Sequence, residues 1–378
     1  MRLFQAFLIG FIACTLAAGD PAVVPPVLAP TNTNPPSSNP PAADPLAAPP
    51  QLIEFARKIA RSEPTSQGRL RKLIATLQEA PESGGLGMRY EVNPTRTLAE
   101  AWRDRKANCL SLTAVYVACA RAMDMNAQYA EVENSQRWRR VDNVIRFERH
   151  MVAVVRDGAN GDLVADFLPQ PRRRFGVYVV TILPEPRVRA LYHSNRAAEL
   201  LQQGDKDGAL LEAQASLDID PTSSVGWNTR GVVLKTKGQH TEAETSYRKA
   251  LKLNPRDISA LGNMENLLLE QRRLREAAEI RRITMKLRRQ DPFFHAFLAE
   301  ESIGAGKLNE ALDHITDALR LQKHEPEFQL LQAHIKVLQG KPEEAARDLE
   351  AALRQAQPGE REIYENALRI LKETASSP

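Results

Sequence analysis

One residue type recurs at a fixed interval through the C-terminal half of this 378-residue chain, and the interval strongly constrains the fold. The recurring residues are Ala209, Ala243, Ala277, Ala311 and Ala345, each 34 positions after the last. Such a period is typical of stacked repeats, in which each unit buries its apolar face only against its neighbours. It predicts five helix–turn–helix units over residues 190–357, with a solvating cap helix in residues 358–378.

Two further sets of positions keep the same register. The turn of each unit falls at Gly204, Gly238, Arg272, Gly306 and Gly340, and the first helix carries a small residue at Ala197, Gly231, Ala299 and Ala333, with Glu265 as the exception. The pattern is clearest from Trp227 to Pro255 and resembles the tetratricopeptide repeat. The resemblance implies an all-α superhelix whose concave face binds a peptide or a partner protein.

The third unit is unusually basic. Its cations are Arg272, Arg273, Arg275, Arg281, Arg282, Lys286, Arg288 and Arg289, and only Glu276 and Glu279 stand among them. One interpretation is a docking strip for an acidic partner, a lipid headgroup or another polyanion. The alternative is an ordinary solvated helix face, and the net charge of +4 for the whole chain does not decide between them.

The N-terminus has the composition of an export signal. One positive charge precedes a short apolar run that ends near Cys14, too short to span a bilayer permanently. The residues before Cys14 resemble a bacterial lipoprotein box, which implies lipidation of that cysteine, whereas plain cleavage near Ala17 is the competing interpretation. Residues 1–19 are therefore predicted to be a signal peptide, and the protein to be periplasmic or anchored in the cell envelope. Export also argues against a nucleic-acid partner.

Residues 20–50 contain eleven prolines and almost no large apolar residues. They predict an extended tether. Residues 51–189 then change from helical to strand-like periodicity: helices are expected within 51–80, from Thr97, and after an N-cap at Asn108, and strands at 127–132, 144–156, 163–168 and 176–183. Helices followed by an antiparallel sheet, with a hairpin turn at 157–162, predict an α+β domain.

Cys109 and Cys119 lie in one predicted helix, about 15 Å apart along its axis. A disulfide needs Cα atoms within roughly 7 Å, so both thiols are expected to be free. Cys109 falls in the first turn, where unpaired N–H groups and the helix dipole favour a thiolate. Cys119 is expected to be plain core. The alternative for Cys109 is also a structural role, the commonest fate of a buried cysteine.

A thiolate nucleophile needs a base, and the base needs an orienting acceptor. His150 and Asp166 meet this need on the predicted hairpin, because they share a facing parity and lie opposite or one diagonal step apart, within about 8 Å. Alone, each would be interpreted as a satisfied strand residue. Together with Cys109 they predict a Cys–His–Asp triad.

The order and context of these residues resemble the transglutaminase-like superfamily, a branch of the papain-like fold. The matching motifs are Ala107–Leu112 at a helix start, His150 on a strand, and Asp166 before Phe167–Pro169. The resemblance covers roughly residues 52–183 and implies acyl transfer through a cysteine thioester. Asn108 stands where many members have glycine. The oxyanion hole is expected to use the Cys109 N–H and one more donor, with Asn108, Trp102 and Trp138 as candidates.

No metal motif, phosphate-binding loop or dinucleotide fingerprint occurs, so no cofactor is expected. Two functions remain open. The first is an exported cysteine acyl-transfer enzyme, a protease, amidase or cross-linker, whose repeats recruit substrate. The second is a non-catalytic envelope adaptor in which both domains serve protein binding.

Overall fold

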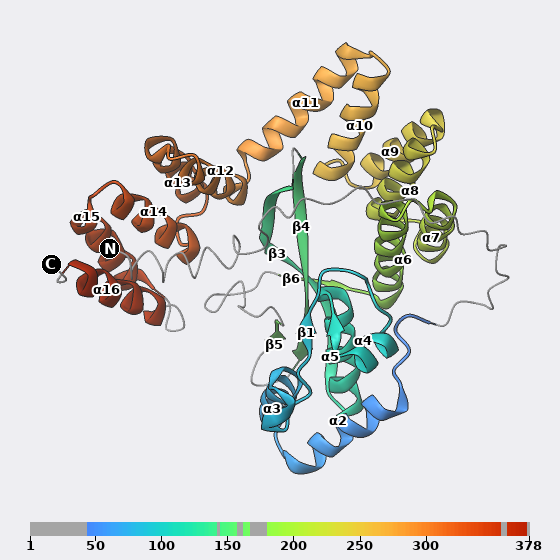
Figure 1. Ribbon diagram of the computed structural model, residues 1–378, viewed down its shortest axis with the longest axis horizontal. Helices are drawn as coiled ribbons and strands as arrows, with labels where there is room; N and C mark the ends of the chain where they lie inside the picture. The colour runs from blue at the N-terminus through green and yellow to red at the C-terminus, as the bar shows by residue number, and fades with distance from the viewer. Residues whose placement is uncertain (1–43, 142–143, 157–161, 167–179, 357–360, 376–378) are drawn as a thin grey trace, which may run out of the picture. The chain divides into compact units, whose positions relative to one another are not determined.

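The computed structural model describes residues 44–141, 144–156, 162–166, 180–356 and 361–375 (Figure 1). The predicted signal peptide, Cys14, most of the predicted tether, the turn of the hairpin and residues 167–179 lie outside these ranges. The described residues form two compact units that divide between Phe293 and Phe294.

The first unit begins with helices that bury one long core helix. The helices are α2 (Pro50–Ser62), α3 (Ser66–Gln78), α4 (Leu98–Asp104) and α5 (Cys109–Ala122), with a short 3-10 turn at Pro81–Ser83. Helix α5 packs against α2, α4 and two strands, and its residues Leu112, Val115 and Val117 point in different directions yet are all buried. A helix that carries apolar residues on all sides is stable only inside a core.

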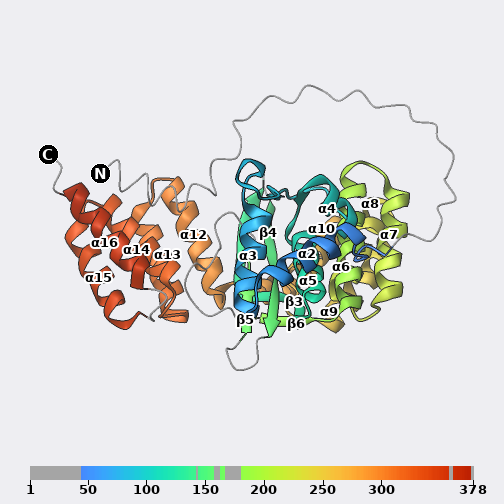
Figure 2. The ribbon, with the colours of Figure 1, turned by 90° about the horizontal axis from the view of Figure 1, so that it is seen from below.

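The strands form an antiparallel sheet in the order β5-β4-β3-β6. They are β3 (Asn126–Val141), β4 (Val144–Arg156), β5 (Asp162–Ala165) and β6 (Val180–Leu183). β1 (Arg89–Tyr90) and β2 (Lys106–Ala107) form a separate parallel pair, and β2 immediately precedes α5. The described residues thus combine helices with a small sheet, as the periodicity predicts, and α5 packs against β3 and β4 of that sheet (Figure 2).

The predicted tether ends earlier than residue 50. The carboxylate of Asp44 pairs with Arg189 at 2.8 Å, and the backbone oxygen of Pro45 accepts a hydrogen bond from Leu98 N at 2.8 Å. Leu46 packs against the core formed by α2–α5. Proline content does not prevent such packing, because a proline-rich segment can still place a single leucine into a core and bond through its carbonyl groups.

Three helix pairs of the repeat region belong to the first unit. They are α6 (Glu185–Gln202) with α7 (Lys206–Ile219), α8 (Ser224–Thr236) with α9 (His240–Leu253), and α10 (Ile258–Glu270) with α11 (Leu274–Arg289). Helix α6 begins before the predicted start at residue 190, because Pro186 in its first turn suits a helix N-terminus. Ala209, Ala243 and Ala277 are buried at the helix contacts.

The turn positions all adopt the left-handed backbone conformation. Gly204 and Gly238 have φ of 88° and 80°, and Arg272 has φ of 59°. This conformation disfavours residues with a Cβ, which explains the glycines. Arg272 occupies the same position in the third pair, so the repeat geometry overrides the local preference of the residue.

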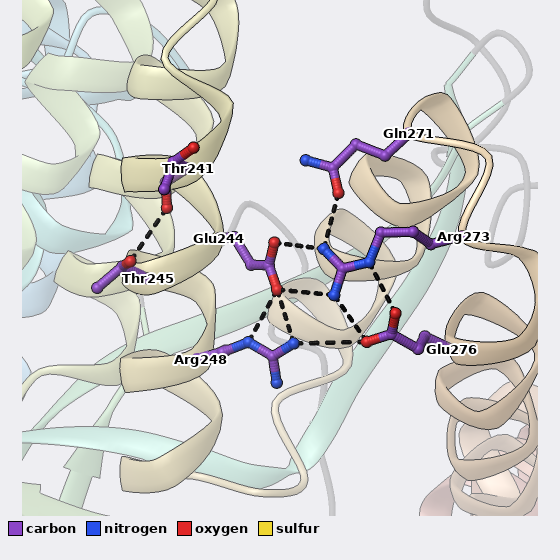
Figure 3. A network of polar contacts seen from close by, with 7 residues as sticks. All are labelled: Thr241, Glu244, Thr245, Arg248, Gln271, Arg273 and Glu276. Carbon is purple, nitrogen blue, oxygen red and sulfur yellow. Dashed lines mark hydrogen bonds and ion pairs between the residues drawn. The ribbon is translucent and has the colours of Figure 1, made fainter.

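A network of charges joins the second and third pairs on α9 and α11 (Figure 3). Arg273 contacts Glu244 at 2.6 Å and Glu276 at 2.7 Å, and Arg248 contacts Glu244 at 2.6 Å. Two of the charges counted in the basic strip, Arg273 and Glu276, therefore serve contacts between repeats. The network is exposed enough that salt will screen it.

The second unit contains the remaining repeats. Its helices are α12 (Pro292–Gly304), α13 (Leu308–Leu321), α14 (Pro326–Leu338), α15 (Pro342–Gln355) and α16 (Arg361–Ala375). Ala311 and Ala345 are buried, as are Ala299 and Ala333. Helix α16 packs on α14 and α15 through Tyr364, Ala367, Leu368 and Leu371, in the place where the sequence predicts a cap helix.

The register predicts opposite effects for one substitution at two helical glycines. A Cβ on Gly231 would lie 2.5 Å from the ring of Tyr247, whereas a Cβ on Gly262 would meet nothing within 4 Å. Gly231→Ala is expected to lower the free energy of unfolding by about 1–3 kcal/mol through overpacking. Gly262→Ala is expected to raise it by roughly 0.5–1 kcal/mol, because alanine restricts the unfolded chain and favours helix. Denaturant unfolding of both variants checks the two signs, and equal effects would contradict this repeat packing.

Candidate functional site

Cys109 is the first residue of α5, and a capping interaction fixes it there. The side-chain oxygen of Asn108 accepts a hydrogen bond from Ser111 N at 3.1 Å, which satisfies one of the free N–H groups of the first turn. Cys109 is partly exposed, whereas Cys119 in the same helix is fully buried. Burial raises the pKa of the Cys119 thiol, so at neutral pH Cys119 is an unreactive core residue. Both thiols are free, as their spacing predicts.

His150 and Asp166 meet across the hairpin of β4 and β5. His150 Nε2 lies 2.8 Å from Asp166 Oδ1, and both side chains are almost fully buried (3% and 4% exposed). The strand register pairs Ala153 with Ala165, so Asp166, one residue further, falls opposite Val152 and one diagonal step from His150. This is one of the two arrangements that the parity of the hairpin predicts.

The Cys109 side chain also acts on the imidazole of His150 and helps to raise its pKa. Burial by itself lowers the pKa of His150, since it disfavours the imidazolium, but the hydrogen bonds to Asp166 and Cys109 and the charges of those groups outweigh it. The net result is a pKa raised above the ordinary value of 6.5.

The three predicted site residues are therefore connected in series from sulfur to imidazole to carboxylate. Such a series can pass the thiol proton to the ring, and the carboxylate can hold the ring in one orientation and stabilise its charged form. Cys109 is partly exposed, while the side chains of His150 and Asp166 are shielded from water. This is a geometry in which a thiolate nucleophile could form.

The three candidates for the second donor of the oxyanion hole lie in different surroundings. The amide of Asn108 is already committed, because its Nδ2 donates to Thr95 Oγ1 at 2.8 Å while its oxygen caps α5. Trp102 is 8% exposed and is covered by Arg105, whose guanidinium carbon lies 4.1 Å from the ring centroid. The Trp138 side chain lies outside the described residues. The N–H groups of the first turn of α5 remain the donors nearest to the sulfur.

Two residues that no sequence pattern singles out hold the start of α5. Thr95 accepts the hydrogen bond from Asn108, and its own backbone N donates to Glu199 Oε1 at 2.6 Å. Thr95 lies in a loop, and Glu199 lies on the first repeat helix, where one charged residue looks like any other on a helix face. The signal that could have found Glu199 is its burial, which periodicity does not reveal.

The predicted basic strip lines a hollow on α11 of about 480 Å³. Its wall includes Arg281, Arg282, Lys286 and Arg289 together with the apolar side chain of Met285, which is 45% exposed. Arg281 also pairs with Glu265 at 2.6 Å, so part of the charge is neutralised within the repeat. Glu265 is the departure from the small-residue pattern of the first helices.

Other kinds of site are not found among the residues that the structure describes. No group of three or more histidine, cysteine or acidic side chains there could hold a metal ion. No described helix is both long and apolar enough to cross a bilayer.

The raised pKa of His150 predicts how its protonation responds to substitution. The imidazole of the unchanged protein should titrate above pH 6.5, whereas in Asp166→Asn burial should dominate and move the titration below 6.5. By linkage, the paired imidazolium stabilises the fold fully below pH 6.5 and loses this contribution as pH rises through the raised pKa. Imidazole NMR titration, with His150→Gln to assign the signal, measures both midpoints. A midpoint below 6.5 in the unchanged protein would contradict the pairing.

Comparison with known proteins identifies the repeats. The model of the tetratricopeptide repeat family matches residues 224–257, which include α8 and α9. The chain is 35% identical over 77 residues to the type IV pilus assembly protein PilF of Pseudomonas aeruginosa, covering 20% of this chain and 31% of that protein. It is 35% identical over 82 residues to the DnaJ protein P58IPK homolog B of Oryza sativa subsp. japonica, covering 22% and 17%. The chain thus spans less than a third of the length of these relatives.

Solved structures with similar helix pairs include that of Pseudomonas aeruginosa pilF, which is 22% identical over 51% of this chain and 96% of that chain, with a TM-score of 0.27. A thermophilic TPR protein of Thermus thermophilus is 18% identical over 47% and 98%, with a TM-score of 0.26. These superpositions are too loose to carry an argument. The family match at residues 224–257 and the helix pairs in the same 34-residue register are sufficient: this chain contains tetratricopeptide repeats, which suggests a function in protein–protein interaction.

Proposed function

We propose that the region 51–189 is a papain-like, transglutaminase-like cysteine enzyme that transfers the acyl group of a protein or peptide amide, with Cys109, His150 and Asp166 as its catalytic residues. The observation that carries the proposal is the buried His150, which is bonded to Asp166 and whose pKa is raised by both Asp166 and Cys109. A histidine buried only for packing would need one satisfied partner and no adjoining thiol at a helix N-terminus.

The proposed reaction follows from the order of the groups. The Cys109 thiol gives its proton to His150, and the sulfur attacks the carbonyl carbon of the amide. The carbon–nitrogen bond breaks, the imidazolium protonates the departing amine, and an acyl thioester remains on Cys109. Water or a second amine then attacks the thioester and gives its proton to His150. The carbon–sulfur bond breaks, releasing an acid or a new amide and restoring the thiolate.

The repeats are proposed to recruit the substrate or a partner protein on their concave face. The hollow on α11 supports an acidic partner, because Arg282 and Lys286 line it beside the exposed apolar side chain of Met285. An acidic segment with an apolar residue fits this chemistry better than a purely polar anion does.

An envelope location is proposed from two observations of different kinds. The N-terminal sequence is typical of export, with Cys14 as the proposed lipidation site, and a local relative is a pilus assembly protein in Pseudomonas aeruginosa. Lipidation at Cys14 would tether the folded body to the membrane surface through the proline-rich segment.

A second candidate function is a non-catalytic adaptor. The repeat match favours it, because tetratricopeptide repeats suggest protein–protein interaction. In this case the described α+β region would be a binding platform, and the Cys109–His150–Asp166 series would be structural.

Thiol reactivity separates the two functions. Iodoacetamide at about pH 7 should alkylate Cys109 about tenfold more slowly in His150→Gln than in the unchanged protein, because the imidazole no longer takes the thiol proton. Site-resolved mass spectrometry measures the rate, and Cys119 is an internal control, since its thiol reacts only when the core opens. Equal Cys109 rates in the two proteins would refute the catalytic proposal and leave the adaptor.

Turnover can be tested on a generic acyl donor. Incorporation of a fluorescent amine into casein, and release of peptides from it, should be abolished by Cys109→Ala and retained by a folded Cys119→Ala variant. Activity that survives in Cys109→Ala would assign it to a contaminant or to another group. Casein is a probe only, so recovery of proteins acylated onto Cys109 in cells is the complementary measurement.

The acidic partner is tested by charge reversal on α11. Binding of a fluorescent glutamate-rich peptide with a central leucine should weaken at least about tenfold in Arg282→Glu, Lys286→Glu, and should weaken with added salt. The matched control is Lys252→Glu, Arg256→Glu in the second repeat, which makes the same change in net charge at exposed positions. Equal loss in both variants would show only a general charge effect and would contradict a site on α11.

A further inference from the structure

A buried carboxylate on the first repeat helix reaches the start of the helix that carries Cys109. Glu199 on α6 is 6% exposed, and its Oε1 accepts a hydrogen bond from Thr95 N at 2.6 Å. Its other oxygen accepts from Arg196 at 2.7 Å. A buried carboxylate is costly unless it is paired, so both oxygens need these donors.

Thr95 also forms a hydrogen bond with Asn108. Its hydroxyl oxygen accepts from Asn108 Nδ2 at 2.8 Å, and Thr95 and Asn108 are 3% and 6% exposed. The amide of Asn108 has only one workable orientation, because its oxygen must accept from Ser111 N to cap α5. The nitrogen must then point to Thr95. A backbone–side-chain chain of three hydrogen bonds therefore links α6 to the first turn of α5.

A second bond holds the same loop against α5. Ser111 Oγ donates to the backbone oxygen of Arg96 at 2.6 Å, and Ser111 is 1% exposed. The loop is thus bonded to the first turn of α5 through both Thr95 and Arg96, and it is bonded to the repeats through Thr95. Loss of the Glu199 contact would leave the loop attached to α5 and would release Thr95 from α6.

We propose that Glu199 is a positioning residue for Cys109, acting through Thr95 and Asn108, so that the first repeat sets the orientation of the proposed nucleophile. This inference rests on the proposed function, in which the orientation of the sulfur toward His150 matters. Glu199 acts at a distance from the reacting atoms. Its effect is transmitted by the cap: if Asn108 turns, the first turn of α5 frays and the sulfur loses its fixed direction.

These three hydrogen bonds, which we call the relay, give the repeats a means to influence the site without contacting substrate there. A partner that shifts α6 relative to the α2–α5 core would move the acceptor of Thr95 N, and the cap would follow. Coupling of this kind requires that the hydrogen bonds be buried and connected, and all three bonds satisfy this.

The test is the pH–rate profile of Cys109 alkylation by iodoacetamide in the full chain, which needs no substrate. Glu199→Ala should slow the reaction about tenfold at about pH 7 and move the profile to higher pH. Glu199→Gln keeps an acceptor oxygen for Thr95 N and should restore the profile. Glu212→Ala is the matched control, since this carboxylate of the same repeat pairs with His193 at 2.7 Å rather than with the loop.

Thr95→Val keeps the test decisive if Glu199→Ala fails to fold. This variant retains the N–H that bonds to Glu199 and removes only the hydroxyl acceptor for Asn108. Thr95→Ser restores that acceptor. A shifted profile in Thr95→Val, reversed in Thr95→Ser, supports the relay. Profiles identical to that of the unchanged protein in Glu199→Ala or, where that variant is unfolded, in Thr95→Val overturn it. If His150→Gln still slows alkylation in that case, the proposed catalytic function stands without the relay.

Discussion

Helix α5 is buried on every side, and this constraint determines where its first residue can lie. A buried helix cannot leave its first N–H groups to water, so the start of α5 requires a cap from the chain itself. Asn108 provides that cap, and its remaining donor is satisfied by Thr95. The consequence is that Cys109, next in sequence, is held at the edge of the core and is partly exposed, while Cys119, further along the same helix, is buried.

The sheet brings the other two groups to the same place. His150 comes from the long strand β4 and Asp166 from the end of β5, and the antiparallel register brings them within hydrogen-bonding distance although they are far apart along the chain. The pairing with Asp166 is the largest of the effects that outweigh burial and raise the pKa of His150. Without the carboxylate, burial would lower the pKa of His150 and so disfavour its imidazolium form.

The repeats differ from this region in how their contacts are distributed. Small residues, such as Ala243 and Gly231, are buried where the repeat helices pack, so the register can be recognised by period alone. The joint with the α+β region combines apolar packing of Val188 with individual polar contacts: Asp44 with Arg189, and Thr95 with Glu199. The polar contacts follow no period.

The sequence by itself determined the structural features that follow from local patterns of residues. The 34-residue period predicts the helix pairs, the all-apolar segment predicts a buried α5, and the parity of a hairpin predicts that His150 and Asp166 face each other. Contacts between residues of large sequence separation were decided only by the tertiary structure. The hydrogen bond between Thr95 and Glu199 and the pairing of Asp44 with Arg189 belong to this class. The physical reason is that periodicity shows which face of a helix or strand is buried, but not which polar group of another element contacts that face.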